Sequence, residues 1–163
     1  MAISRHHRLI AFGLAVSYRM SPHNKLSDDD IESLKRDIDA IHANQDAFCF
    51  NEGDRTGFYD RKGVVNVRGD VFPDTSSTHP RDLMSTRAVL AHEYYGHYQF
   101  APSQFAVGNW RDELRVSYIA AISTPNLSDD DRRLLILDAY ERAKESGHYF
   151  DYTKKAREII YGR

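Results

Sequence analysis

Apolar residues recur at helical spacing directly after a serine and three aspartates. They occupy every third or fourth position, which lines one face of an α-helix; they are Ile31, Leu34, Ile38 and Ile41. Ser27 is a favoured N-cap residue, and the acidic residues at 28–30 suit the positive end of the helix dipole. The pattern predicts an amphipathic helix over residues 28–43.

The pattern then changes to aromatic and β-branched residues punctuated by glycine, which is typical of short strands. We expect strands at residues 47–51, 57–60 and 64–72, in a small antiparallel sheet. Within the third strand, Val65 and Val67 alternate with polar residues, which indicates one buried face. At a sheet edge, this strand either holds an extended peptide by backbone pairing or serves only in packing.

The remaining pattern is helical. A polar loop at residues 73–80, with a role as rim or lid, leads into a helix that starts near residue 80 or 82. Helices are expected at residues 9–18, from about 80 to 100, at 108–123, from 129 to 146 and at 152–161. Together these elements predict an α+β fold in which a short antiparallel sheet packs on a helical bundle. The length of 163 residues predicts one domain, 1–163.

The segment Ala91-His92-Glu93-Tyr94-Tyr95-Gly96-His97 combines two imidazoles and a carboxylate in the expected helix. In zinc peptidases a His-Glu-x-x-His motif places both histidines on one helix face, with the glutamate as general base. Here the step is one residue longer, and five residues turn an ideal helix by roughly 140° between the two side chains. A single wide π-turn removes this problem, and Gly96 permits it or allows close approach of a partner helix.

These residues resemble the His-Glu-x-x-Gly-His motif of the dipeptidyl peptidase III family. A second patch, Asp112-Glu113-Leu114-Arg115, is similar to that family's Glu-Glu-x-Arg segment. The resemblance implies a zincin-like domain in which His92, His97 and Glu113 bind Zn²⁺, Glu93 is the base and Asp112 orients a ligand histidine. A later acid of the family falls at Ser117, which is a departure. The chain is too short for the family's two lobes, so a shared metal site is implied without a shared substrate.

Three protein ligands would leave a fourth zinc position for water, as in catalytic sites. Glu93 would then accept the water proton and pass it to a leaving amine. Donors for the developing oxyanion are sought among a set of nearby polar residues: Arg115, Tyr118, His148, Tyr149 and Tyr152. We therefore expect a zinc metallopeptidase or amide hydrolase acting on a peptide or protein, for example as a compact toxin-effector domain.

Two alternatives stay open: a binding module that keeps the metal for structure, and a phage or host-interaction protein that works through its helical surface. A formal net charge of −2 gives no electrostatic case for nucleic acid. The single cysteine, Cys49, forms no internal disulfide and is expected to be a small buried group. No segment predicts a membrane span. Residues 5–16 have the basic flank and apolar run of a secretory signal but no convincing cleavage site, which favours the cytoplasm over secretion.

Overall fold

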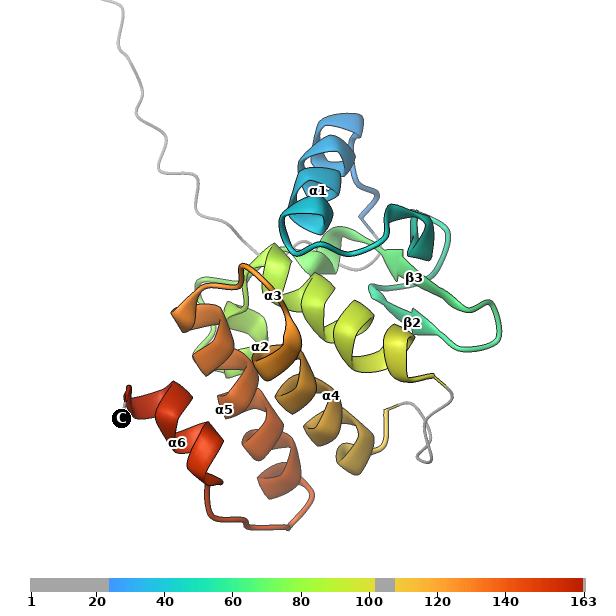
Figure 1. The fold of residues 1–163 in the computed structure, drawn as a ribbon. Helices are drawn as coiled ribbons and strands as arrows, with labels where there is room; N and C mark the ends of the chain where they lie inside the picture. Colours follow the sequence, from blue (N-terminus) through green and yellow to red (C-terminus); the bar gives the residue numbers. More distant parts are fainter. Residues whose placement is uncertain (1–23, 102–107, 163) are drawn as a thin grey trace, which may run out of the picture.

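The computed structural model describes residues 24–101 and 108–162, so the helix expected at residues 9–18 lies outside the described residues. The described part is a small α+β domain (Figure 1). Its α-helices are α1 (Asp28–Ala40), α2 (Pro80–Leu83), α3 (Thr86–Ala91), α4 (Trp110–Ser123), α5 (Asp129–Glu145) and α6 (Lys154–Tyr161). Its strands are β1 (Phe48–Phe50), β2 (Gly57–Tyr59) and β3 (Val64–Val67). Short helical turns are η1 (Gln45–Ala47), η2 (Gly69–Val71), η3 (His92–His97) and η4 (Tyr98–Phe100).

The sheet is mixed, so the prediction of an antiparallel sheet was wrong for one of its two pairings. The strand order is β1-β3-β2: β2 pairs antiparallel with β3, whereas β1 pairs parallel with it. Asn51, at a φ of 62°, turns the chain out of β1, and residues 51–56 carry it past β3 before β2 begins. The Val-rich β3, with three of its four residues buried, thereby gains partners on both sides. Among the described residues the edge strands are β1 and β2, not the segment containing Val65 and Val67.

The helix predicted from residue 80 to 100 is divided into four pieces. Met84, at ψ 137°, leaves helical geometry after α2. Ser85 then caps α3, because its side chain accepts the backbone N–H of Ala88. The chain continues as α3, the π-helical η3 and the 3₁₀ turn η4. The break lets α2 and α3 run in different directions, so α2 contributes to the site from its own position.

Other boundaries differ by a few residues from those expected. The first helix ends at Ala40 because Ile41 is its C-cap and His42 has a φ of 56°. The third strand ends at Val67, and η2 follows within the predicted span. The helix beginning at residue 129 is confirmed, with Ser128 accepting the N–H of Asp131 as its cap. Among the described residues, no helix has the length and apolar composition needed to cross a bilayer.

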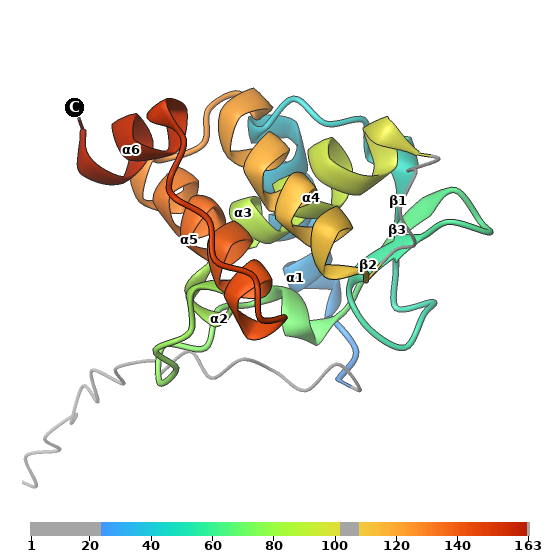
Figure 2. The ribbon, with the colours of Figure 1, turned by 90° about the horizontal axis from the view of Figure 1, so that it is seen from below.

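The segment formed by α3 and η3 runs through the middle of the molecule, between the sheet on one side and α4 and α5 on the other (Figures 1 and 2). Tyr94 stacks on Phe48 of β1, with ring centroids 5.7 Å apart. The hydroxyl of Tyr95 donates to the carbonyl oxygen of Ile41 at 2.7 Å. Both tyrosines are buried and serve in packing.

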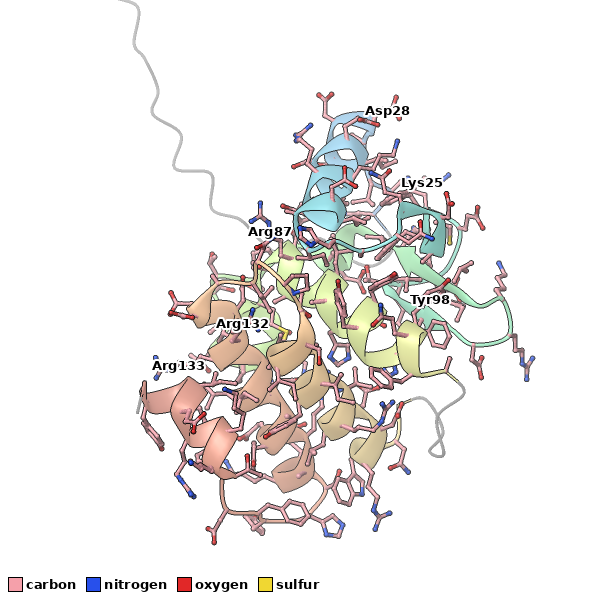
Figure 3. The ribbon with its side chains drawn as sticks, viewed as in Figure 1. Lys25, Asp28, Arg87, Tyr98, Arg132 and Arg133 are labelled. Atoms are coloured by element: carbon pink, nitrogen blue, oxygen red, sulfur yellow. The ribbon has the colours of Figure 1, made fainter. Side chains whose placement is uncertain are left out.

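Polar contacts add to this packing at the surface. Arg87 of α3, labelled in Figure 3, pairs with Asp37 of α1 at 2.8 Å. Cys49 is free and half-buried, and its thiol lies 3.7 Å from the side-chain oxygen of Asn66. The motif segment is thus held against the sheet and against α1 before the site itself is considered.

Candidate metal centre

Both motif histidines lie on a π-helical turn. His92–His97 form η3, in which backbone hydrogen bonds span five residues rather than four. The two imidazole rings lie 5.2 Å apart between centroids, and both side chains are buried. The predicted wide turn is confirmed. It places two residues separated by a five-residue step on one face of the chain.

Gly96 gives α4 close access to this turn. A Cβ atom at Gly96 would lie 2.2 Å from Cγ1 of Val116 and 2.9 Å from the carbonyl oxygen of Val116. Its φ is not in the left-handed region, so the glycine is required for contact rather than for an unusual backbone angle. This contact sets how closely α4 approaches η3.

Glu113 lies in the first turn of α4, which Asn109 caps by accepting the N–H of Arg111. Its Oε2 lies 3.3 Å from Nε2 of His92, and its Oε1 lies 3.5 Å from Nε2 of His97. Ligand atoms bound tetrahedrally to zinc at about 2.0–2.2 Å are roughly 3.3–3.6 Å from one another. One ligand atom from each of His92, His97 and Glu113 lies within 4.8 Å of the other two, so the cluster could hold a metal ion.

The charges of the cluster favour a cation at this point. Burial alone would raise the pKa of Glu113, but hydrogen bonds to His92 and His97 and the positive charges of His92 and Arg142 hold it well below its usual range. Burial opposes protonation of His97, yet its hydrogen bond to Glu113 and the nearby carboxylates raise its pKa. Both shifts reflect the opposite charges of neighbouring groups, and the carboxylates gathered at the cluster would also attract a metal cation.

The second nitrogen of His97 faces Asp112, as the sequence predicted. Nδ1 of His97 lies 3.3 Å from Oδ2 of Asp112, which is fully buried. Arg115 holds the other oxygen of Asp112 at 2.8 Å. A carboxylate in this position fixes the ring orientation and leaves Nε2 directed at Glu113.

The second nitrogen of His92 is held by Ser117, the position that departs from the family pattern. Nδ1 of His92 lies 2.9 Å from Oγ of Ser117, and this hydroxyl donates to Oδ2 of Asp138 at 2.8 Å. Because the hydroxyl has one hydrogen, Nδ1 of His92 must be the donor to Ser117. In a neutral ring this leaves the lone pair on Nε2, which lies on the side of the ligand cluster and could bind a metal ion. A buried acid from α5 thus reaches the histidine through a hydroxyl.

Glu93 lies beside the ligand cluster without joining it. Its Oε1 lies 4.0 Å from Nε2 of His92, farther than either oxygen of Glu113 from its nearer histidine. The backbone N–H of Phe58, on the free edge of β2, donates to its Oε2 at 2.8 Å. The Phe58 ring also stacks against His97, with centroids 6.3 Å apart. The sheet therefore orients the carboxylate expected to act as base.

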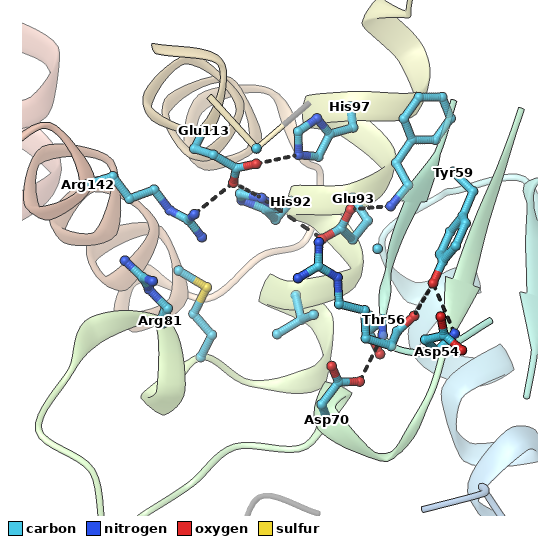
Figure 4. A pocket seen from close by; sticks show the side chains of 16 residues that line it. Asp54, Thr56, Tyr59, Asp70, Arg81, His92, Glu93, His97, Glu113 and Arg142 are labelled. Atoms are coloured by element: carbon cyan, nitrogen blue, oxygen red, sulfur yellow. Dashed lines mark hydrogen bonds and ion pairs between the residues drawn. The ribbon is translucent and has the colours of Figure 1, made fainter. Parts of the chain in front are cut away.

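The cluster opens into a cavity of about 770 Å³ (Figure 4). Its lining includes His92, His97, Glu93 and Glu113, together with residues of β2 and of α2. This volume lies in the range of small-molecule and cofactor sites. An accessible cleft therefore lies over the three candidate ligands.

The five residues suggested as oxyanion donors do not line this cavity. Arg115 is paired with Asp112, and the hydroxyl of Tyr118 bonds Thr153 at 2.8 Å. His148 stacks on Trp110, Tyr152 packs against Tyr140, and Tyr149 is 78% exposed. They occupy other faces of α4 and the connection between α5 and α6.

The cavity is instead lined by Arg55, Arg81 and Arg142, which the sequence analysis did not single out. Nη1 of Arg142 lies 2.8 Å from Oε2 of Glu113. The i,i+4 spacing of Asp138 and Arg142 on α5 was a visible sign of a pair. Nothing local linked that pair to Glu113, because the contact joins two helices.

The loop histidine His79 has a structural position: it caps α2 and pairs with Glu145 at 2.9 Å.

Comparisons with known proteins give no match, whether to a family model, a curated protein or a solved structure. The chemistry available to the site therefore follows from its own geometry.

Proposed function

We propose that this protein is a zinc-dependent metallopeptidase or amide hydrolase. The observation that supports it best is the position of Glu93, a carboxylate next to three candidate metal ligands, oriented by a backbone amide and lining an open cavity. A structural metal site has no use for a base beside it. The neighbourhood of Glu93 is that of a general base.

Zinc is the metal that suits the donors best. Two imidazoles and one carboxylate form a mixed nitrogen and oxygen set, typical of catalytic zinc sites with three protein ligands. The remaining nitrogen of each histidine is held, one by Asp112 and one by Ser117. Such support is the usual companion of metal-bound histidine.

A bound Zn²⁺ would supply a Lewis acid that polarises a carbonyl and lowers the pKa of a water molecule. Phe58 holds Oε2 of Glu93, which leaves Oε1 to accept a proton from the attacking water. Glu93 then delivers that proton to the leaving amine. The free edge of β2 beside Glu93 is where an extended peptide would pair.

The alternative, a metal-containing binding module without activity, would be favoured by a site closed to solvent. Because an open cavity lies above His92, His97 and Glu113, the site is not closed in this way, and the hydrolase is the better-supported proposal. The resemblance to dipeptidyl peptidase III is thus proposed at the level of the metal site and its base.

Substitution of Glu93 by Gln tests the proposal. The Glu93→Gln variant should keep one zinc ion per chain, measured by elemental mass spectrometry, because Glu93 is not a ligand. Its rate of peptide hydrolysis should fall by about 10²–10⁴-fold, since a general base contributes that much. Cleavage is followed by mass spectrometry on a randomised peptide library.

The exposed Glu52 provides a matched control, and Glu52→Gln should keep both zinc and activity. His97→Ala should lose both. Zinc-loaded wild-type protein that cleaves the library no faster than Glu93→Gln would contradict the proposed mechanism.

A further inference from the structure

Two guanidinium groups form one wall of the cavity next to the candidate metal ligands. Arg142 comes from α5 and Arg81 from α2, and both line the cavity with Glu113 (Figure 4). Arg142 is within 2.8 Å of Glu113, so this wall begins directly at the ligand cluster. The pair is partly exposed, with side-chain accessibilities of 33% for Arg81 and 20% for Arg142.

A single buried carboxylate holds both arginines in place. Asp138 has a side-chain accessibility of 0%; its Oδ2 accepts from Nε of Arg142 at 2.7 Å, and its Oδ1 lies 3.4 Å from Nε of Arg81. The Arg81 contact is an ion pair without hydrogen-bond alignment, so Nε of Arg81 has no hydrogen-bond partner among the described residues. Asp138 therefore holds both guanidinium groups in place through their Nε atoms.

The protein leaves much of the hydrogen-bonding capacity of this pair unused. A guanidinium has five N–H donors. Within residues 24–101 and 108–162, the side chain of Arg81 makes a hydrogen bond through Nη2 to Glu145, and that of Arg142 makes one through Nε to Asp138. Nη1 of Arg142 is also paired with Glu113, and Nε of Arg81 is buried. Nη1 of Arg81 and Nη2 of Arg142 have no partner among the described residues and are available to a ligand in the cavity.

The charge balance of the wall also favours an anion. Asp138, Glu145 and Glu113 face the two arginines. Glu145 is 46% exposed and shared with His79, so water screens it. A metal ion bound to Glu113 would neutralise part of that carboxylate's negative charge and so weaken its ion pair with Arg142. The two arginines would then share the buried Asp138, and the other carboxylate that faces them, Glu145, is half exposed to water.

We infer that Arg81 and Arg142 bind a carboxylate of the substrate, so that the bond to be hydrolysed lies close to an anionic group. This inference rests on the proposed hydrolase function. Paired guanidiniums match a carboxylate in geometry as well as in charge. The cavity accommodates a short peptide, whose carboxylate comes either from a free C-terminus or from an acidic side chain.

Binding to zinc-loaded Glu93→Gln protein separates this inference from catalysis. Three pools of acetyl-capped tripeptides, randomised at two positions, are compared by equilibrium dialysis and mass spectrometry. One ends in a free carboxylate, one ends in an amide, and one ends in an amide but carries an aspartate in place of one random residue. A charge-assisted contact predicts about tenfold or greater preference for one acidic pool over the neutral pool.

That preference should disappear when Arg81→Gln is added, and also with Arg142→Lys, which keeps the charge but loses the planar fork. Arg133→Gln, on an exposed position of α5, is the matched control and should keep the preference. Thermal unfolding of each variant checks that it is folded.

The inference would be overturned if zinc-loaded Glu93→Gln protein bound the acidic and neutral pools equally, or bound neither. A preference that survives when Arg81→Gln is added would also overturn it. The outcome is independent of hydrolysis. An anion preference without any cleavage by the Glu93-containing protein would retain this subsite and reject the proposed function.

Discussion

At the scale of single residues, the most informative position is Ser117. Where the metal motif that this chain resembles has an acid, this chain has a hydroxyl between His92 and Asp138. The carboxylate is still present, but it comes from α5 rather than α4. The supporting shell of the site is therefore built from two helices.

Replacing Ser117 by Ala should weaken zinc binding about 10–100-fold, the usual effect of losing a group that orients a metal-bound histidine. The change removes the acceptor for Nδ1 of His92 and leaves Asp138 without its hydroxyl donor. Competition with a chelator of known affinity measures the loss. Ser123→Ala, at the exposed end of α4, should have no effect. Unchanged affinity in Ser117→Ala would show that the relay does not support the metal.

The local motifs placed His92, His97, Glu113 and Asp112 correctly near one another. Helical geometry relates His92 to His97 and Asp112 to Glu113. The link between these two segments, which lie on different elements, came from the resemblance to a known motif. Arg81 and Arg142 escaped prediction because Arg81 reaches Asp138, and Arg142 reaches Glu113, through contacts between different helices.

At the scale of elements, the π-helical η3 and α4 depend on one close contact. The wide turn brings His92 and His97 to one face, and the missing side chain of Gly96 lets Val116 approach. Local composition had indicated both features. The division of the predicted long helix into α2 and α3 was missed, because Ser85 competes as a cap in the middle of an otherwise helical pattern.

Gly96→Ala should destabilise the fold by about 1–3 kcal/mol, because overpacking forces neighbours apart. The added Cβ would lie 2.2 Å from Cγ1 of Val116. Urea unfolding measures the change in the free energy of unfolding. Gly57→Ala is the control, since a Cβ there meets nothing within 4 Å.

Adding Val116→Ala to Gly96→Ala should recover part of the loss. Recovery is expected to be incomplete, because the carbonyl oxygen of Val116 also lies 2.9 Å from the added atom. Equal stability of Gly96→Ala and Gly57→Ala would contradict the close approach of α4.

At the scale of the whole molecule, a bound ion would link η3 to α4. His92 and His97 come from one element and Glu113 from the other. A ligand that binds only the folded state stabilises it by mass action. Zinc binding and global stability should therefore be coupled.

Zinc at about 100 times its dissociation constant should raise the unfolding free energy by about 2.7 kcal/mol, or the melting temperature by roughly 5–10 °C. Differential scanning fluorimetry measures the shift, and a chelator should reverse it. Mg²⁺ should have little effect, because it prefers oxygen ligands. His97→Ala should abolish the zinc response. A similar shift in that variant would place the ion elsewhere.

The sequence by itself determined the α+β class and the capped helices, because periodicity and capping act between near neighbours. Its resemblance to a known metal motif singled out His92, His97, Glu113 and Asp112 as candidates. Only the tertiary structure decided that β3 is the central strand, that Phe58 orients Glu93, and that Asp138 holds two arginines beside the ligands. Those contacts join segments far apart in the sequence, and they form only when the packing of the core brings their elements together.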